Sequence, residues 1–232
     1  MKLTQRGMPT LANILVFSLT AGLATPAFAQ NLVVNGSFEA NSCNNTANTG
    51  YRLGLSGSDM SGWYIPSTDG TYPWCLQNLN AFGAGPAADG NQWLVLGEGG
   101  NTHFTIQQTL NGLTPGGVYN LGFSIASEQE CCSVAEVSFL TGSLTPAQTF
   151  SAPTSGQWWT QWGAESMNFV ASSSSVSFQF RDLTPAGGHD LGLDAVSVEG
   201  LTSTSTPEPA SLALLGTGLF GLVPMMRRKF RK

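Results

Sequence analysis

The sequence predicts an all-β domain over residues 30–200, built as a two-sheet sandwich. Short stretches alternate apolar and polar residues with period two, which is typical of half-buried strands. No stretch in this range has comparable helical periodicity, and turn signals rich in glycine and proline separate the alternating stretches, as in β-sandwiches. The alternating stretches are Phe104–Leu110, Tyr119–Ile125, Val137–Phe139, Met167–Phe169 and Val176–Phe180.

The first 29 residues have the pattern of a signal peptide. Two basic residues precede an apolar run over 11–23, and Ala27 and Ala29 are small residues at the positions that signal peptidase reads. We expect cleavage after Ala29. An uncleaved anchor is the alternative, but the run is short and is interrupted by polar residues.

The charge of the domain limits its partners. Residues 31–200 contain 13 of the 14 acidic side chains but two of the nine basic ones, Arg52 and Arg181, so the formal charge is −11. Such a surface repels phosphate backbones, which argues against nucleic acid. Divalent cations and neutral or basic polymers remain possible partners.

Four cysteines in an exported chain predict two disulfides, for which three connectivities exist. Cys131 and Cys132 are adjacent in sequence, and a bridge between neighbouring residues is strained. We therefore expect each of them to pair with Cys43 or Cys75. No cysteine spacing is typical of a zinc or redox site.

Six motifs in order resemble a known family. The segments are Asn31–Glu39, Gly62–Trp63, Asp89–Leu96, Ile106–Gln108, Leu113–Phe123 and Leu193–Val198. Together they resemble a galactose-binding-like jelly roll, akin to the bacterial relatives of the DUF642 proteins and to several carbohydrate-binding modules. The resemblance covers nearly the whole domain and implies a jelly-roll sandwich that binds carbohydrate.

The resemblance also implies a structural calcium site, although no cofactor is otherwise required. In modules of this shape a Glu that ends the first strand motif and an Asp in the last strand often hold Ca²⁺, and the matching residues are Glu39 and Asp194. Asp194 has the parity of Val196 and Val198, which points it to the core, where an ionised carboxylate needs compensation. Oxygen ligands suit calcium. The alternatives are a bulge that turns Asp194 to solvent and hydrogen bonds from backbone N–H groups.

Aromatic residues provide the candidate sugar contacts, because sugars stack their C–H faces on rings. Since neighbouring strand residues face opposite ways, one of Trp158 and Trp159 packs inside. The predicted ligand-binding residues are Tyr72, Trp74, Trp159 and Trp162. Burial in the core is the alternative for each tryptophan, and we expect it for Trp63 and Trp93.

The sequence predicts no enzymatic activity. His103 and His189 are the only histidines, and the Gly-x-Ser-x-Gly, His-Glu-x-x-His and phosphate-loop motifs are absent. A glycosidase that uses two carboxylates, such as Glu128 and Glu130, is the remaining catalytic alternative.

The C-terminal tail has three parts after a Ser/Thr-rich linker at 201–206. Pro207-Glu208-Pro209 comes first, then an uncharged run over 210–226, then a basic end over 227–232. As a helix the 17-residue run would reach about 25 Å, enough to cross a slightly thinned bilayer. The basic end, which begins with Arg227 and Arg228, is then cytoplasmic. From hydropathy alone the alternative is a plain anchor.

The order of these parts resembles the PEP-CTERM sorting signal of Gram-negative bacteria. The resemblance implies an exosortase that cleaves near Pro207-Glu208-Pro209. The chain would be exported, anchored in the membrane for a time, and then placed on the cell surface or in the matrix. The sequence thus predicts a surface protein that binds exopolysaccharide. The alternative is a structural matrix protein, for example of a biofilm, without a defined ligand.

Overall fold

The computed structural model describes residues 30–40, 43, 51–66, 73–77, 84–97, 103–129, 132–154 and 158–201. The predicted signal peptide, the sorting tail, Tyr72, Glu130 and Cys131 lie outside the described residues. Within them the chain forms ten strands and no helix. No helix in this part of the chain has the length and apolar character needed to cross a bilayer.

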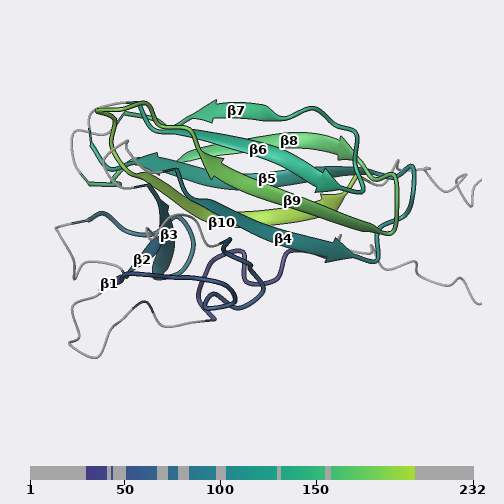
Figure 1. Cartoon of the computed structure of the whole chain (residues 1–232), viewed down its shortest axis with the longest axis horizontal. Helices are drawn as coiled ribbons and strands as arrows, with labels where there is room; N and C mark the ends of the chain where they lie inside the picture. Colours follow the sequence, from purple (N-terminus) through teal and green to yellow (C-terminus); the bar gives the residue numbers. More distant parts are fainter. Residues whose placement is uncertain are drawn as a thin grey trace, which may run out of the picture.

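Two antiparallel sheets form the sandwich (Figure 1). The six-stranded sheet has the order β1 (Tyr51–Arg52), β2 (Trp74–Gln77), β3 (Gln92–Leu96), β10 (Leu191–Gly200), β5 (Val118–Ser127) and β8 (Gly163–Val170). The four-stranded sheet has the order β4 (Thr105–Asn111), β9 (Ser175–Asp182), β6 (Val134–Thr141) and β7 (Gln148–Ser151). The prediction of an all-β, two-sheet sandwich is confirmed.

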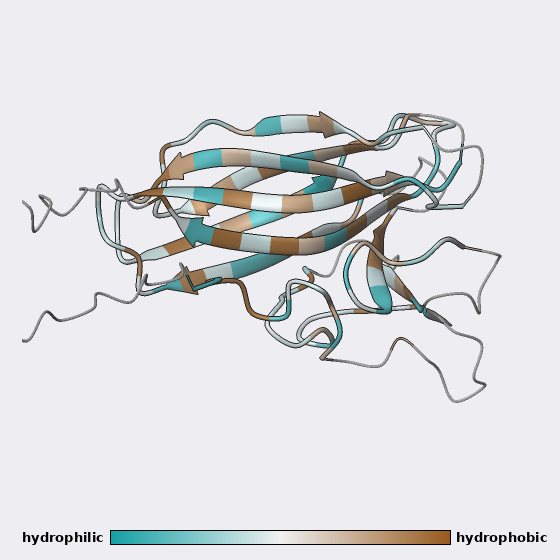
Figure 2. Cartoon of the chain, turned by 180° about the vertical axis from the view of Figure 1, so that it is seen from behind, coloured by the Kyte–Doolittle hydropathy of each residue, from teal (hydrophilic) through white to brown (hydrophobic). Residues whose placement is uncertain are grey.

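The alternation in the sequence sets which side chains fill the core. Along β5 and β9 every second residue is buried, and Phe123 and Phe180 meet edge to face across the sandwich with ring centroids 5.0 Å apart. Figure 2 shows the same alternation as hydrophobic and hydrophilic bands along the strands. The outward residues of β4 and β9 are consequently polar and available to a ligand.

The N-terminal segment 31–39 is not a strand, although its motif was expected to be one. Asn35 and Phe38 have φ values of 55° and 58°, in the left-handed region, and the backbone turns there. Two hydrogen bonds still tie the segment to β10, from the Leu32 N–H to the Val198 carbonyl and from the Val196 N–H to the Gly36 carbonyl, each 2.9 Å. Gly36 is required at this contact, since a Cβ would lie 1.9 Å from the Val196 oxygen.

The expected disulfide pairing is wrong. Cys43 bonds to Cys75, with a Cα–Cα distance of 5.4 Å, and joins the N-terminal segment to β2. Cys132 is also disulfide-bonded, but not to Cys43 or Cys75, and its partner lies outside the described residues. Sequence separation gave no information on which segments the fold brings together.

Candidate functional site

A groove of about 560 Å³ lies over the outer face of the four-stranded sheet. Side chains of β4, β6 and β9 form its floor, and the segment 58–64 forms one wall. The lining residues are Ser58, Gly62, Trp63, Tyr64, Gln107, Gln108, Thr109, Leu140, Thr141 and Ser177. None of them is an acidic or basic residue.

A row of hydrogen-bonded polar side chains crosses three neighbouring strands in and beside this groove. The side-chain amide of Gln107 donates from Nε2 to Oε1 of the Gln179 side chain at 3.2 Å. The Nε2 of Gln179 in turn donates to the Ser138 hydroxyl at 3.0 Å. The hydroxyls of Thr109 and Ser177 are 2.7 Å apart. These contacts hold the amides and hydroxyls in fixed positions, where their remaining donors and acceptors can meet a ligand.

Tyr64 supplies the aromatic surface of the groove. Its ring is 54% exposed, while its neighbours Trp63 and Ile65 are buried. Its backbone pairs with Gln107 of β4 in both directions, with N···O distances of 2.8 and 2.9 Å. The segment thus acts as a short additional edge strand that places Tyr64 beside the polar row.

Packing beneath Tyr64 keeps the wall in place. The Trp63 indole N–H donates to the Asn35 carbonyl at 2.9 Å, and its ring meets Phe178 edge to face at 5.8 Å. Gly62 has a φ of 83°, and a Cβ there would lie 2.8 Å from Val34 atoms. Tyr64 was not among the ligand-binding residues predicted from the sequence. The available signal was its position next to Trp63, which was expected in the core, because neighbouring strand residues face opposite ways.

Five of the six tryptophans form a second, separate cluster on the outer face of the six-stranded sheet. Trp74, Trp93, Trp158, Trp159 and Trp162 pack there with Leu76, Val95 and Ala126. Trp159 stacks edge to face on Trp74 at 5.8 Å and is tilted against Trp93 at 6.2 Å.

The prediction that Trp159 contacts ligand is wrong, because its exposed fraction is 0%. Residues 158 and 159 lie in a turn, where Trp159 has a φ of 46°, and this turn places its ring inside. Trp74, Trp158 and Trp162 are half-buried. A role in ligand binding stays a prediction for Trp74 and Trp162, and Tyr72 lies outside the described residues.

Glu39 and Asp194 converge on one loop. The Glu39 Oε1 accepts from the N–H groups of Asn91 and Gln92, both at 2.6 Å. The Asp194 Oδ2 accepts from the Asp89 N–H at 2.9 Å, and its Oδ1 accepts from the Ala195 N–H at 2.7 Å. The two carboxylates therefore hold the backbone of the loop that leads into β3.

The surroundings of Asp194 have features of both alternatives to a calcium site, the β-bulge and the hydrogen bonds from backbone N–H groups. β10 does have a register shift between Asp194 and Ser197, and Ala195 has a φ of 52°. The side chain is nevertheless completely buried and receives backbone hydrogen bonds. Burial raises the pKa of Asp194 to about 7, against the opposing effect of these hydrogen bonds.

The hydrogen bonds offset the burial of the Asp194 carboxylate only in part, so a bound cation would stabilise its ionised form further. A carboxylate has about four lone-pair positions, so the N–H donors do not use all the oxygen ligands of Glu39 and Asp194. Among the described residues, no three acidic, histidine or cysteine side chains lie close enough together to hold one metal ion. Backbone carbonyls and water would therefore complete the coordination. We propose that these two carboxylates hold a structural Ca²⁺.

Calcium is expected to raise the melting temperature of the mature domain. At a calcium concentration a hundredfold above Kd, the rise should be about 5–10 °C, since binding to the folded state adds about 2.7 kcal/mol. Differential scanning calorimetry with Ca²⁺ and with EDTA measures it, and Asp194→Asn should abolish the difference. Equal melting temperatures of the wild type in both buffers would contradict the calcium site.

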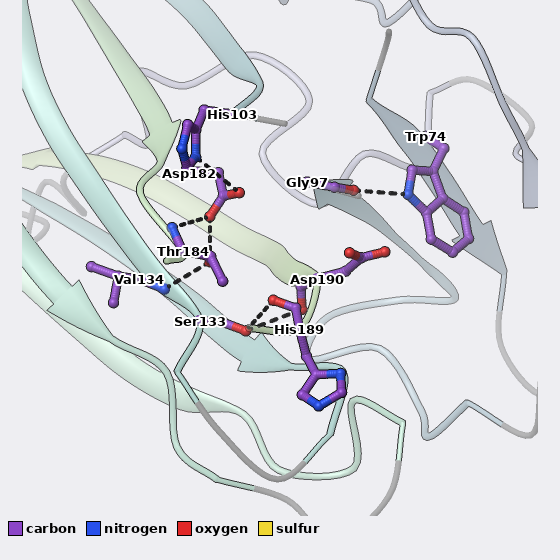
Figure 3. Close-up of polar contacts among 9 residues, drawn as sticks. All are labelled: Trp74, Gly97, His103, Ser133, Val134, Asp182, Thr184, His189 and Asp190. Carbon is purple, nitrogen blue, oxygen red and sulfur yellow. Dashed lines mark hydrogen bonds and ion pairs between the residues drawn. The ribbon is translucent and has the colours of Figure 1, made fainter. Parts of the chain in front are cut away.

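The two histidines lie in a polar cluster between the loops at one end of the sandwich (Figure 3). His103 Nδ1 is 3.8 Å from the Oδ2 of the buried Asp182, and the Thr184 N–H donates to Asp182 Oδ1 at 2.9 Å. The Ser133 hydroxyl donates to the backbone carbonyl of His189 at 2.7 Å, and the His189 ring points away from it. A nucleophile activated by an adjacent imidazole requires a different geometry. These contacts join β6 to the loops after β9.

Glu128, one of the two acids considered for a glycosidase, also has a structural partner. Its Oε2 is 3.6 Å from His189 Nδ1 and accepts from the Asp190 N–H at 3.4 Å. It thereby fixes the loop that leads into β10. Glu130, the other acid, lies outside the described residues.

The tail matches a family model. Residues 205–232 match the model described as the PEP-CTERM protein-sorting motif, which confirms the resemblance found in the sequence. No curated protein matches the chain. The resemblance to the DUF642 proteins stays a prediction.

Solved structures similar to the chain include carbohydrate-binding modules. One is TmCBM61 in complex with beta-1,4-galactotriose, at 15% identity over 74% of this chain and 99% of that chain, with a TM-score of 0.47. Another is the CBM22-1 xylan-binding domain of Xyn10C from Paenibacillus barcinonensis, at 13% identity over 76% and 97%, with a TM-score of 0.40. A third is the enzymatically active domain of tailspike protein 4 from bacteriophage CBA120, at 13% identity over 74% of this chain and 21% of that chain, with a TM-score of 0.47. Similarity of this degree does not assign a ligand.

Proposed function

We propose that this chain, which carries a PEP-CTERM sorting motif, is a non-catalytic surface or matrix protein that binds a neutral polysaccharide through the Tyr64 groove. The sorting motif supports export, processing by an exosortase, and temporary anchoring through residues 207–232. The groove supports the binding role. Signal peptidase and exosortase would be its processing enzymes.

The observation that carries the binding proposal is the position of Tyr64 beside fixed amides and hydroxyls. A sugar needs an apolar ring for its C–H face and hydrogen-bonding partners for its hydroxyls. Tyr64 supplies the ring, while Gln107 and Thr109 in the lining, and Gln179 beside it, supply donors and acceptors. The groove is preformed, because its side chains already bond to one another, so little conformational entropy is lost on binding.

Charge favours a neutral polymer. The groove lining contains no acidic or basic residue, and the domain carries a formal charge of −11. A polyanion such as a uronic-acid or sulfated polymer would be repelled by the domain and would find no cation in the groove. The producer's own exopolysaccharide meets this requirement if it is neutral.

A glycan array with residues 30–206 tests the proposal. We expect binding to one class of neutral oligosaccharides or polysaccharides, and none to acidic glycans of similar length. Binding should be insensitive to salt, because no ion pair contributes. Binding only to acidic glycans, or to no glycan, would overturn the proposal and leave a structural matrix protein.

A further inference from the structure

Exposed aliphatic side chains gather at the end of the sandwich where the chain continues toward the tail. Leu144 is 92% exposed, and Val118, Val170 and Leu201 are between 42% and 49% exposed. Val118 pairs with Val170 across β5 and β8, and the Leu201 N–H donates to the Val118 carbonyl at 2.9 Å. We call these four residues the exit patch.

The exit patch is continuous with a shallow hollow. Leu144 and Val170 line a cavity of about 270 Å³ together with Thr145 and Ser172. The Val170 N–H donates to the Thr145 hydroxyl at 3.3 Å, which holds the loop of Leu144 against β8. Leu144 is thus presented on a supported loop rather than folded back on the core.

Charge is nearly absent from this end. Segments 111–118, 140–147 and 170–176 contain no Asp, Glu, Lys or Arg, although the domain carries a charge of −11. These segments follow or precede the ends of β4, β6 and β8, which lie together with the end of β10 at the right of Figure 1. Glu199, exposed on β10, is the nearest acidic residue in sequence to Leu201. The acidic side chains therefore lie mainly toward the other parts of the domain.

The covalent connection makes this end the one nearest to the membrane before processing. Eight residues, 202–209, separate Leu201 from the apolar run that begins at 210. Fully extended, they span at most about 29 Å. Exposed leucine and valine side chains, with Glu199 as the nearest carboxylate in sequence, let this end approach a bilayer at a smaller desolvation cost than a surface rich in carboxylates would impose.

We propose that the exit patch rests on the lipid surface in the unprocessed chain, with Leu144 in the interfacial layer. The occupant is a lipid bilayer rather than a protein, because the same chain places a bilayer within reach and the patch offers no charge for pairing. Since the patch also lacks lysine and arginine, the contact does not need anionic lipid. The inference rests on the sorting half of the proposed function.

Residues 30–232 reconstituted into phosphatidylcholine vesicles provide the test. An environment-sensitive fluorophore is attached at Leu144→Cys, and in a second sample at Ser151→Cys. Leu144 precedes the start of β7, and Ser151 is an exposed residue at the other end of this strand, so it serves as the matched control. Leu144 is almost fully exposed, so its substitution should not unfold the domain.

We expect the chain to float with the vesicles, the emission at position 144 to shift to the blue, and a lipid-borne quencher to reduce it. Position 151 should show neither effect. Flotation with identical spectra at both positions would overturn this inference but leave the sorting proposal intact. Failure to float would overturn the anchoring itself. A blue shift seen only when an exosortase is present would overturn lipid as the occupant in favour of the enzyme.

Discussion

Asp194→Ala should lower the free energy of unfolding of the mature domain by about 3 kcal/mol or more. The substitution removes the acceptor of the partly buried N–H groups of Asp89 and Ala195, and a hydrogen bond to a charged group is worth about 1.5–3 kcal/mol. It also opens a cavity between β10 and the loop before β3. Urea denaturation followed by tryptophan fluorescence measures the change.

Glu199→Ala is the matched control, because Glu199 lies on the same strand but is exposed. Its cost should stay within about 0.5 kcal/mol. Equal costs for the two substitutions would contradict the role of Asp194 in holding the loop.

The pH dependence in EDTA gives a second readout. The pKa of Asp194 rises from 3.8 to about 7 on folding. The stabilisation by the protonated carboxyl is therefore fully present below the pKa of the unfolded state. It is lost as the pH rises through the pKa of the folded state. The contribution is on the order of 4 kcal/mol. The wild type should thus lose stability relative to Asp194→Asn between about pH 4 and pH 7.5, whereas a constant difference would contradict the raised pKa.

Tyr64→Ala should weaken glycan binding by at least about tenfold, or ~1.4 kcal/mol, without unfolding the domain. The side chain is half exposed, and the hydrogen bonds that join its backbone to Gln107 do not depend on it. Isothermal titration calorimetry with the glycan found on the array measures the loss.

Tyr64→Phe and Trp162→Ala are the controls for this loss. The phenylalanine keeps the ring and should stay close to the wild type. Trp162 belongs to the tryptophan cluster on the other sheet, so its truncation should leave affinity unchanged. If Trp162→Ala instead binds the glycan weakly and Tyr64→Ala binds it with wild-type affinity, the binding site is the tryptophan cluster.

The sequence was informative where a residue's environment follows from period two. The alternation along β5 and β9 predicted which side chains fill the core, and the parity of Asp194 predicted its burial on β10. Both rest on local backbone geometry, which neighbouring residues largely determine.

The errors arose where the backbone leaves the regular strand or where distant segments meet. Trp159 is buried because residues 158 and 159 lie in a turn, where the alternation of a strand does not apply, and nothing in the adjacent Trp158 signals that turn. Cys43 bonds to Cys75, 32 residues further along the chain, because the fold brings Cys43 next to β2. Tyr64 becomes a candidate ligand residue only once its segment is paired with β4, which is a long-range contact.

An NMR titration of the 15N-labelled mature domain with the identified glycan tests the central claim most directly. The two candidate surfaces carry different reporters. The groove has the side-chain amide of Gln107, with that of Gln179 beside it, and the tryptophan cluster has indole N–H groups. We expect the glutamine amide signals to shift with the glycan while the indole signals of Trp158 and Trp162 stay in place. Shifts confined to those indole signals would show that the groove is not the binding site.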